Sequence, residues 1–344
     1  MTPPPPVRRG NPPPPSIEDV ARLAGVSAQT VSRVSRSAPN VRPETRQKVL
    51  DAMDRLGYAP NRAARALRSG TFRTIGVITQ RLVRTGENLV TAGIASRAEE
   101  KGYSLALFQV SHPETPELQR ASLRLGHQSL DGLIVVQAGG AYRGSLSLPR
   151  SMPIVVSDSD LIDDFPSVVT DQSEGSRALM DHLLALGHRR IGHITGSSDA
   201  RSAHVRTRTW RTALAESGAP EGPLLEGDWS AESGYRAALR LVDEHPETTA
   251  LFCANDETAI GAIRALHERG LAVPEDVSVA GFDGIALSEF SSPPLTTVHV
   301  DFEAIGRELV DALLSRIDSG GEPLERRVVP SRLVVRGSTG PARI

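Results

Sequence analysis

Short runs of branched aliphatic residues recur along most of the chain and alternate with segments long enough for amphipathic helices. The runs cover residues 74–79, 103–109, 132–137, 153–157, 190–195, 249–254 and 277–282; the first reads TIGVIT and the last VSVAGF. Strands this apolar are buried on both faces, as happens where helices cover both sides of a parallel sheet. The sequence therefore predicts an α/β structure with parallel sheets for the greater part of the chain.

A different pattern occupies residues 17–34, which read IEDVARLAGVSAQTVSRV. The spacing of its first apolar residues predicts one buried helix stripe, formed by Ile17, Val20, Leu23 and Ala24. Ser16 stands where an N-cap oxygen is needed, Gly25 tolerates a positive φ, and Ser27 can cap a second helix that begins at Ala28. The segment therefore predicts two short helices joined by a tight turn.

The second helix has one apolar face and one polar face. Val31 and Val34 lie three residues apart and form the packing side. The outward face holds Ala28, Gln29, Ser32 and Arg33. Gln can bind adenine and Arg can bind guanine with two hydrogen bonds each, so this face suits the major groove of DNA. The alternative is an ordinary helical hairpin with a solvated polar face, which the Gly and Ser positions disfavour.

The charge distribution separates this end of the chain from the remainder. Residues 1–70 contain 12 Lys or Arg against 5 Asp or Glu, whereas the remaining residues contain 27 against 36. A basic small domain attached to an acidic large one is typical of a protein that presents one end to a polyanion.

Residues 43–56 predict a third helix for the basic domain, with Val49, Leu50, Met53 and Leu56 inside and Gly57 at its end.

Composition limits the remaining possibilities. A chain of 344 residues is long enough for two or three domains, and its 39% hydrophobic content suits a globular α/β protein. One cysteine, Cys253, allows no disulfide within the chain. We find neither a signal-peptide core nor a run long enough to span a bilayer, so we expect a cytoplasmic protein without membrane contact. Residues 1–15 contain two runs of four prolines and predict a disordered tail.

The helix-turn-helix segment resembles the DNA-binding headpiece of the LacI/GalR family of bacterial transcription regulators, and the resemblance continues almost to the end of the chain. It implies that Ala28, Gln29 and Arg33 read bases, while Thr30 and Ser32, next to the capping Ser27, lie near phosphates. Departures from the family pattern are Ser35 and Arg36 after the second helix and Arg42 at the third cap. Pro43 partly compensates for Arg42, since its fixed φ suits the first position of a helix.

Residues 61–70, NRAARALRSG, join the two parts of the chain. An isolated helix this short is marginal in water, so it needs a partner to form. The resemblance implies a hinge helix that folds on DNA against its dimer mate, with Leu67 inserted into the minor groove. The expected contacts of this hinge are Asn61, Arg62, Ala64 and Leu67. The alternative is a plain linker whose Leu67 packs on the core.

The resemblance also implies that the core has two lobes, as in periplasmic sugar-binding proteins, with a ligand between them. Ligands of open α/β sheets lie at the carboxyl ends of strands. The residues implied for effector binding are Asp158, Arg206, Trp229, Asn255 and Asp283, with Arg206 expected to begin a helix. Carboxylates, an amide, an arginine and an aromatic ring suit a sugar or glycoside. Each has a structural alternative: an Asp or Asn after a strand often caps a helix, and a Trp often lies in the core.

The first-lobe side of this expected site departs from the family pattern. Arg84 and Glu87 stand where family members often carry apolar or small residues.

A second class of function is a sugar-binding or sugar-modifying protein without a role at DNA. The sequence has no Gly-Lys pair of a phosphate-binding loop and no GxSxG motif, so we expect no enzyme activity and no cofactor. His188 and His193 in GHRRIGH suggest a metal site, but a structural role is the favoured interpretation and we expect no metal.

These observations predict a small all-α helix-turn-helix headpiece and a two-lobed α/β core like that of periplasmic binding proteins. The predicted parts are a tail (1–15), the headpiece (16–59), a hinge helix (60–70) and the core (71–344). The resemblance implies that a helix over 302–317 and a strand over 332–336 complete the core. We expect a homodimeric repressor that binds a pseudo-palindromic double-stranded operator and a small sugar-like effector. Past Arg336 the chain has eight residues and no leucine heptad, so a dimer rather than a tetramer is expected.

Overall fold

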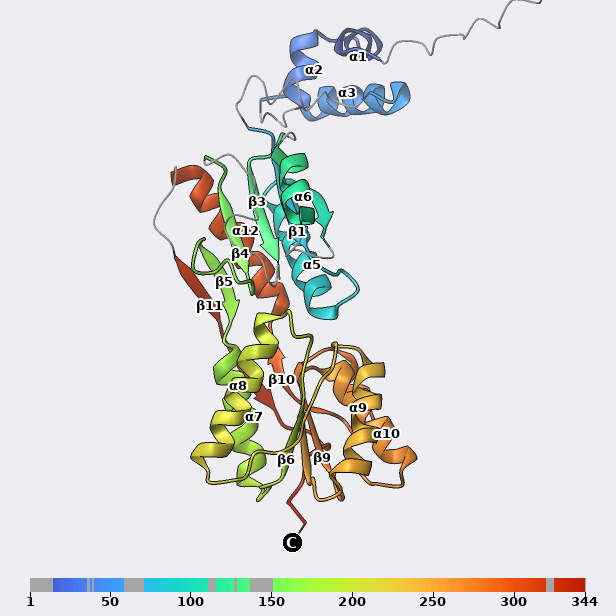
Figure 1. Ribbon diagram of the computed structural model, residues 1–344. Coiled ribbons are helices and arrows are strands. Elements are labelled where there is room, and N and C mark those ends of the chain that lie inside the picture. The colour runs from blue at the N-terminus through green and yellow to red at the C-terminus, as the bar shows by residue number, and fades with distance from the viewer. Residues whose placement is uncertain are drawn as a thin grey trace, which may run out of the picture. The chain divides into compact units, whose positions relative to one another are not determined.

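The computed structural model describes residues 15–35, 38, 40–58, 71–110, 116–126, 129–136, 151–319 and 325–343. The chain divides into two compact units, residues 1–72 and 73–344. The predicted tail and hinge helix lie almost entirely outside the described residues. Figure 1 shows the elements of both units.

The described residues of the first unit form three helices that match the predicted ones. They are α1 (Ile17–Ala24), α2 (Ala28–Val34) and α3 (Pro43–Leu56). The hydroxyl of Ser16 accepts from the Asp19 N–H at 3.2 Å, and the Asp19 carboxylate accepts from the Ser16 N–H at 2.9 Å. Gly25 ends α1 with φ +66°, and the Ser27 hydroxyl caps α2 by accepting from the Thr30 N–H. The predicted caps and turn are confirmed.

The core of this unit is built from small branched residues. Val20, Val31 and Val49 are fully buried where the three helices meet. Two predicted core residues are wrong: Leu23 is 41% exposed and Leu50 is 44% exposed. Each neighbours a residue that packs inward, and consecutive helix positions point about 100° apart, so a domain of three short helices buries only a narrow stripe.

The second unit holds two six-stranded sheets, one in each lobe. The first-lobe strands, in sheet order, are β2 (Ser104–Gln109), β1 (Thr74–Thr79), β3 (Gly132–Val136), β4 (Ile154–Ser157), β5 (Ser167–Thr170) and β11 (Arg326–Val329). All of its pairings are parallel. The helices of this lobe are α5 (Thr85–Glu100), α6 (Pro116–Gly126) and α12 (Phe302–Ser319). This is the predicted α/β arrangement, with β1 at the position where the strand order reverses.

The second lobe repeats the same strand order. Its strands are β7 (Leu224–Leu225), β6 (Ile191–Ile194), β8 (Ala250–Cys253), β9 (Ser278–Asp283), β10 (Thr296–Val300) and β12 (Ser331–Val334). Only the β12 pairing is antiparallel. The helices are α7 (Gln172–Ala185), α8 (Arg201–Glu216), α9 (Ala231–Glu244), α10 (Asp256–Glu268) and the short α11 (Leu287–Phe290). In Figure 1, α7 and α8 cover one face of this sheet and α9 and α10 cover the other.

The chain passes between the lobes three times. The crossings follow β5 at Asp171, β10 at Asp301 and β11 at Pro330. Each crossing is a single residue between two regular elements, so the lobes are joined closely at one side while each keeps its own sheet.

All seven strands predicted from apolar runs are confirmed, but four others were not predicted. The unpredicted strands are β5, β7, β10 and β11. β7 has two residues and β5 has four, β10 reads TTVHV, and β11 alternates exposed and covered positions at a sheet edge. None of them forms the continuous apolar run from which the other strands were predicted. The predicted helix over 302–317 is α12, and the strand predicted at 332–336 is β12, displaced by one to two residues.

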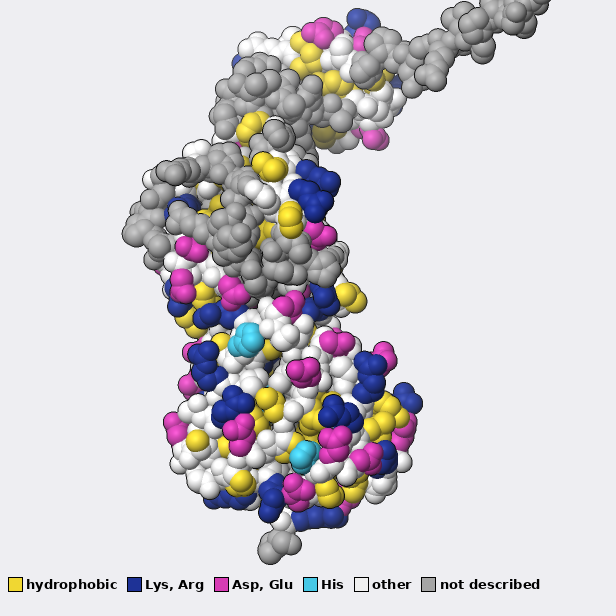
Figure 2. Space-filling view, in the orientation of Figure 1, with side chains coloured by type: hydrophobic (Ala, Val, Ile, Leu, Met, Phe, Trp, Pro, Cys, Tyr) yellow, Lys and Arg dark blue, Asp and Glu magenta, His cyan; other side chains and the backbone are white. Residues whose placement is uncertain are grey.

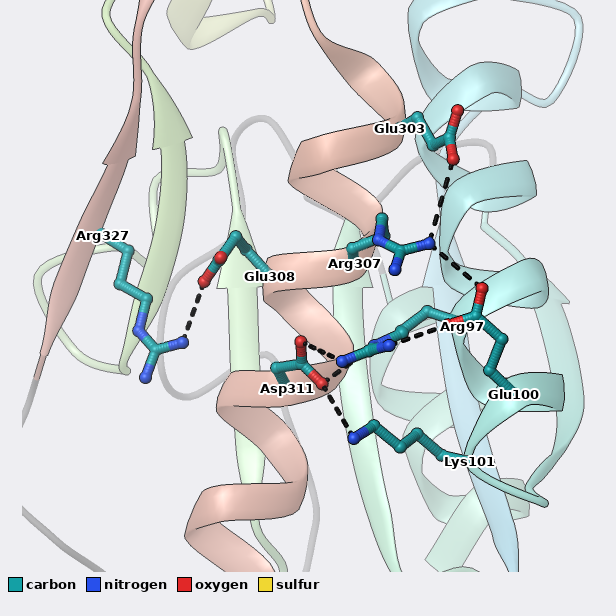
Figure 3. Close-up of polar contacts among 8 residues, drawn as sticks. All are labelled: Arg97, Glu100, Lys101, Glu303, Arg307, Glu308, Asp311 and Arg327. Atoms are coloured by element: carbon teal, nitrogen blue, oxygen red, sulfur yellow. Dashed lines mark hydrogen bonds and ion pairs between the residues drawn. The ribbon is translucent and has the colours of Figure 1, made fainter.

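Helices α5 and α12 pack with their backbones almost touching. Gly93 faces Gly306, and a Cβ at Gly306 would lie 2.6 Å from backbone atoms of Gly93 and Ile94. Beside this contact, Arg97 donates two hydrogen bonds to Asp311, at 3.0 and 2.9 Å. Figure 3 shows these ion pairs together with those of Glu100, Lys101, Glu303, Arg307, Glu308 and Arg327. The two helices therefore behave as one rigid element of the first lobe.

The visible face of the second lobe carries positive and negative side chains interspersed, with small apolar areas between them (Figure 2). Within the described ranges, no helix is long and apolar enough to cross a membrane.

We predict that Gly306→Ala lowers the free energy of unfolding of the full chain by about 1–3 kcal/mol, because the added methyl group forces apart two backbones that already touch. Helix propensity alone would favour alanine by about 1 kcal/mol, so a loss identifies the contact between the helices. Chemical denaturation measures the change. The control is Gly337→Ala, whose nearest atoms would lie 3.6 Å away and which should be neutral. A stabilised Gly306→Ala protein would contradict the close packing of α5 and α12.

Candidate functional site

The outward face of α2 is the first candidate site. Gln29 and Arg33 are exposed and lie one helical turn apart, whereas Ala28, Thr30 and Ser32 are partly covered. Ser27 has its hydroxyl engaged at the helix start, within 2.9 Å of the Thr30 hydroxyl. The structure thus presents an amide and a guanidinium side by side on a helix whose other face is buried. The predicted hinge contacts Asn61, Arg62, Ala64 and Leu67 lie outside the described residues.

The second candidate site is a cavity of about 400 Å³ between the two lobes. It opens at the carboxyl ends of strands from both sheets, where the topology predicts a ligand. Its lining includes the five residues expected to bind an effector: Asp158, Arg206, Trp229, Asn255 and Asp283. The structure therefore brings together five residues that lie up to 125 positions apart in the sequence.

Arg206 lies at the centre of this group. Helix α8 begins at Arg201, so the expectation that Arg206 begins the helix is wrong: it lies one and a half turns inside, where its side chain reaches the sheet end. Its Nε donates to Gln172 Oε1 at 2.9 Å, one Nη donates to the Ala254 carbonyl, and the other donates to Asp283 at 3.2 Å. The guanidinium also stacks on the Phe282 ring, 3.6 Å from its centroid. These contacts fix its orientation completely.

Two carboxylates flank Arg206 on strained backbone. Asp158 has φ +39° and Asp283 has φ +101°, a region that residues other than glycine seldom occupy. Burial raises the pKa of each to about 6, although the nearby Arg206 charge opposes the rise. Both carboxyls therefore titrate close to neutral pH, which is typical of a functional site rather than of a surface salt bridge.

Trp229 forms another wall of the cavity, also with a positive φ, of +77°. Its ring lies against Gly196, where a Cβ would come within 2.4 Å of three ring atoms, so only glycine fits beneath it. The indole N–H is buried and has no hydrogen-bond acceptor among the described residues. The structural alternative of a fully buried core tryptophan does not apply, since Trp229 is partly exposed to the cavity.

Asn255 has a structural role as well as a place in the lining. Its side-chain oxygen caps α10 by accepting from the Thr258 N–H at 3.0 Å, and its amide donates to the Trp229 carbonyl at 3.0 Å. The capping alternative is thus confirmed for Asn255. The same bonds hold the Trp229 backbone against the start of α10.

Asp256 was not predicted as a site residue, yet it supports the loop that carries Asp283. It is fully buried, accepts from the Ile285 N–H at 2.8 Å and bonds the Thr297 hydroxyl. Burial raises the pKa of Asp256 to about 8, and the Asp283 charge adds to the rise. The loop after β9 is therefore fixed from below by a carboxyl that keeps its proton at neutral pH.

The first-lobe wall contains the two residues that depart from the family pattern. Glu87 is fully buried and one of its oxygens accepts three hydrogen bonds, from the Thr79 hydroxyl and the Gln80 and Arg81 N–H groups. Burial raises the pKa of Glu87, and these bonds oppose the rise. Arg84 lies 3.7 Å from its other oxygen. Glu87 thus holds the loop between β1 and α5 in place.

Two side-chain hydrogen bonds join the lobes near the cavity. The Gln80 amide donates to Asp199 at 2.9 Å, and the Thr85 hydroxyl donates to Glu257. Burial alone would raise the pKa of Asp199, but hydrogen bonds from Ser197 and Gln80, with the Arg84 charge, hold that pKa below its ordinary value. The first-lobe partners all belong to the loop after β1 or to the first turn of α5.

The structure gives His188 and His193 structural partners. His193 is buried, 2.8 Å from the Phe252 carbonyl and 3.1 Å from the Thr207 hydroxyl. His188 bonds Thr249, Ser278 and the Gly340 carbonyl. The favoured structural interpretation of the GHRRIGH segment is therefore confirmed.

Several further lining residues were not singled out from the sequence. They are Gln172, Ser202, Asp228, Glu257, Val300 and Phe302. Gln172, Val300 and Phe302 adjoin the crossings between the lobes, which became apparent only once β5 and β10 were known. Asp228 and Glu257 each lie within two residues of a predicted site residue, and this proximity is the signal that could have found them.

Comparison with known proteins relates both sites to one family. Residues 16–61 match the bacterial regulatory proteins of the lacI family, and residues 180–339 match the periplasmic binding protein-like domain. The HTH-type transcriptional repressor PurR of Haemophilus influenzae is 37% identical over 94% of this chain and 98% of its own length. The lactose operon repressor of Escherichia coli is 35% identical over 94% of this chain and 90% of its own length.

Solved structures agree. The lac repressor dimer bound to operator and the anti-inducer ONPF superposes with a TM-score of 0.82 at 34% identity, covering 95% of this chain and 99% of that one. The transcriptional regulator CelR in complex with cellobiose gives a TM-score of 0.71 at 30% identity, covering 94% and 99%. Because it has the headpiece and the two-lobed core, and because these relatives match it over nearly its whole length, the chain belongs to the lacI family of bacterial regulatory proteins.

Proposed function

We propose that the protein is a transcriptional repressor that binds a specific DNA operator and whose operator affinity is controlled by a sugar or glycoside in the cavity between the lobes. The observation that carries the proposal is the convergence of Asp158, Arg206, Trp229, Asn255 and Asp283 on one cavity. The same chain carries a helix-turn-helix with Gln29 and Arg33 exposed. A DNA reader and a ligand cavity in one chain are the two parts that such a regulator requires.

The DNA part rests on the chemistry of α2. Gln29 can bind adenine and Arg33 can bind guanine in the major groove. Ser27, Ala28, Thr30 and Ser32, which belong to the same helix and its cap, would contact base edges and phosphates beside them. One headpiece reads few bases, so two headpieces on a pseudo-palindromic site are needed for useful specificity. The hinge residues Asn61, Arg62, Ala64 and Leu67 would add minor-groove contacts, with Leu67 as the wedge.

The effector part rests on the lining of the cavity. Carboxylates and a fixed guanidinium suit adjacent ring hydroxyls, and Trp229 offers a flat apolar face to one side of a sugar ring. Among its relatives, the lac repressor has been solved with ONPG, CelR with cellobiose, and a LacI-family regulator of Enterococcus faecium with ribose. A sugar or glycoside is therefore the class of effector we propose for this chain.

A second copy of the chain is the proposed partner of an apolar surface on the second lobe. Leu287 and Phe290 of α11 are 56% and 79% exposed, next to a groove formed by α10. Large apolar side chains this exposed mark an interaction surface when they adjoin each other. The lac repressor relative was solved as a dimer.

The mechanism we propose is a shift between two arrangements of the lobes. The sugar contacts both lobes, so it binds the closed arrangement more tightly and increases its population. Because α5 and α12 move as one element, closure displaces the first lobe as a unit relative to the second. We expect this displacement to lower operator affinity, so that the sugar acts as an inducer.

The DNA contact is tested by Arg33→Ala, which should remove about 1–3 kcal/mol of discrimination between the preferred base pair and its alternatives. The preferred site is first selected from random duplexes, and fluorescence anisotropy then measures its affinity and that of single-base variants at several salt concentrations. The control is Arg55→Ala, which removes an equal exposed charge from α3. If Arg33→Ala weakened every sequence equally, Arg33 would be a phosphate contact. If no sequence were selected and a sugar were converted, the chain would be a sugar-modifying protein instead.

The effector contact is tested by pH. Since the pKa of Asp158 and Asp283 is about 6, both are largely ionised at pH 7 and largely protonated at pH 5, so sugar affinity should fall about tenfold between these values. The stability effect has the opposite sign: a carboxyl whose pKa is raised on folding favours the folded state more as pH falls toward its unfolded value. Weaker binding at pH 5 would thus not arise from unfolding caused by these groups.

Tryptophan fluorescence during titration with mono- and disaccharides measures this affinity, and Asp283→Asn should reduce its dependence on pH. Equal affinity at pH 5 and pH 7 would contradict the role of the two carboxylates. Absence of binding to every saccharide would contradict the proposed effector class.

The dimer surface is tested by Phe290→Glu, which places a charge in the proposed apolar contact and should shift the protein from dimer to monomer in sedimentation velocity. Leu224→Glu is the control, because Leu224 is a 43% exposed apolar residue of β7 on the same lobe. A dimer that survives Phe290→Glu would place the interface elsewhere.

A further inference from the structure

The first-lobe wall of the cavity contains buried polar atoms that lack hydrogen bonds. The side chain of Glu87 is 0% exposed and that of Arg84 is 11% exposed. Within the part of the chain that the structure describes, neither Glu87 Oε1 nor Arg84 Nη2 has a hydrogen-bond partner. Arg84 Nη1 lies 3.7 Å from Glu87 Oε1, which is an ion pair without a hydrogen bond.

Such atoms lower the stability of the folded state, because burial removes their hydrogen bonds to water and no protein group replaces those bonds. Both residues line the cavity, and so does Trp229, whose buried indole N–H also lacks an acceptor among the described residues. One acceptor and two donors on opposite walls therefore lack a hydrogen-bond partner among the described residues. A ligand with several hydroxyls, each able to donate and to accept, matches this set.

The charge of the cavity excludes an anionic ligand. Its described lining holds three arginines against five carboxylates. Burial lowers the pKa of Arg84, with a smaller contribution from the Arg81 charge, whereas the charges of Glu87, Asp199 and Asp228 oppose that fall; three carboxylates thus lie near this guanidinium. A phosphate or carboxylate placed beside Arg84 would meet these negative charges at short range in a partly desolvated site. The wall therefore suits an uncharged polar group.

The position of this wall separates it from the residues that would hold the first sugar ring. Arg206, Asn255 and Asp283 belong to the second lobe, whereas Arg84 and Glu87 start α5 in the first. A cavity of about 400 Å³ has room for more than one pyranose ring. Arg84 also lies 3.9 Å from Asp199 of the second lobe, so a group bound there meets both lobes.

We propose that Arg84 and Glu87 form a polar subsite for the hydroxyls of a second sugar ring, so that the effector is an uncharged disaccharide or longer saccharide rather than a glycoside with an apolar aglycone. The inference rests on the proposed function and specifies its ligand. Arg84 would donate to ring hydroxyls and Glu87 would accept from them. An apolar ring at the same place would leave Glu87 Oε1 and Arg84 Nη2 buried without hydrogen bonds.

The test compares matched ligands that share a first ring. Lactose is paired with phenyl β-galactoside, cellobiose with phenyl β-glucoside, and maltose with phenyl α-glucoside. Titration calorimetry of the full-length wild-type chain should show at least one disaccharide binding about ten- to a hundredfold more tightly than its phenyl partner, the range expected for hydrogen bonds to charged groups. Arg84→Leu should abolish or reverse that preference. Glucose 6-phosphate tests the charge argument and should bind more weakly than the neutral sugars.

Two further variants keep the test decisive. Arg84→Gln retains a hydrogen-bond donor without the charge and should keep part of the preference for the disaccharide. It also provides a test if Arg84→Leu does not fold. Arg236→Leu removes an exposed arginine of α9 and should change nothing. A preference that Arg84→Leu and Arg84→Gln leave intact, a wild-type preference for phenyl glycosides, or tight binding of glucose 6-phosphate would overturn the subsite alone. If the wild type bound no saccharide of either kind, the proposed function would fail and the subsite with it.

Discussion

The contact on which the ligand cavity depends is the buried guanidinium of Arg206. It joins the start of α7 through Gln172, the end of β8 through the Ala254 carbonyl and the end of β9 through Asp283. Burial lowers the pKa of Arg206, while Asp283 and Asp158 oppose that fall, so the charge persists in a site that water hardly reaches. A planar fork with fixed donors can join three elements in this way, whereas a lysine would offer a point charge without the same geometry.

The backbone at three residues of the cavity wall is strained, which also indicates that this region is held in place by its surroundings. Asp158, Trp229 and Asp283 all have positive φ, although none is glycine. Such backbone persists only where surrounding contacts outweigh its cost. Here those contacts are visible: Asn255 bonds the Trp229 carbonyl, and Asp256 bonds the N–H of Ile285 just beyond Asp283. All three strained residues line the cavity, and for Trp229 and Asp283 residues packed behind them stabilise the strained backbone.

Sequence reasoning was successful where a local pattern determines the structure. The caps at Ser16 and Ser27, the turn at Gly25 and the long apolar strands follow from short-range chemistry, and residues just after those strands do line the cavity. It failed where position depends on distant partners. Strand β11 pairs with β5 of the first lobe although the chain has formed most of the second lobe between them. No local sequence pattern indicates this pairing. Likewise, Glu87 is an ordinary acidic residue in the sequence and becomes a buried anchor only because the end of β1 lies against α5.

The two lobes can respond to a ligand because their connections are few and their interiors are rigid. Single-residue crossings at Asp171, Asp301 and Pro330 allow rotation, whereas the α5–α12 contact at Gly93 and Gly306 resists deformation inside the first lobe. Close-packed interiors pass displacement on rather than absorb it. Since α5 and α12 both begin at the cavity, through Thr85 and Phe302, a ligand there acts directly on the ends of the rigid element. Under the proposed subsite, the polar groups at the start of α5 would both select the ligand and, through Arg84 and Thr85, contact the second lobe.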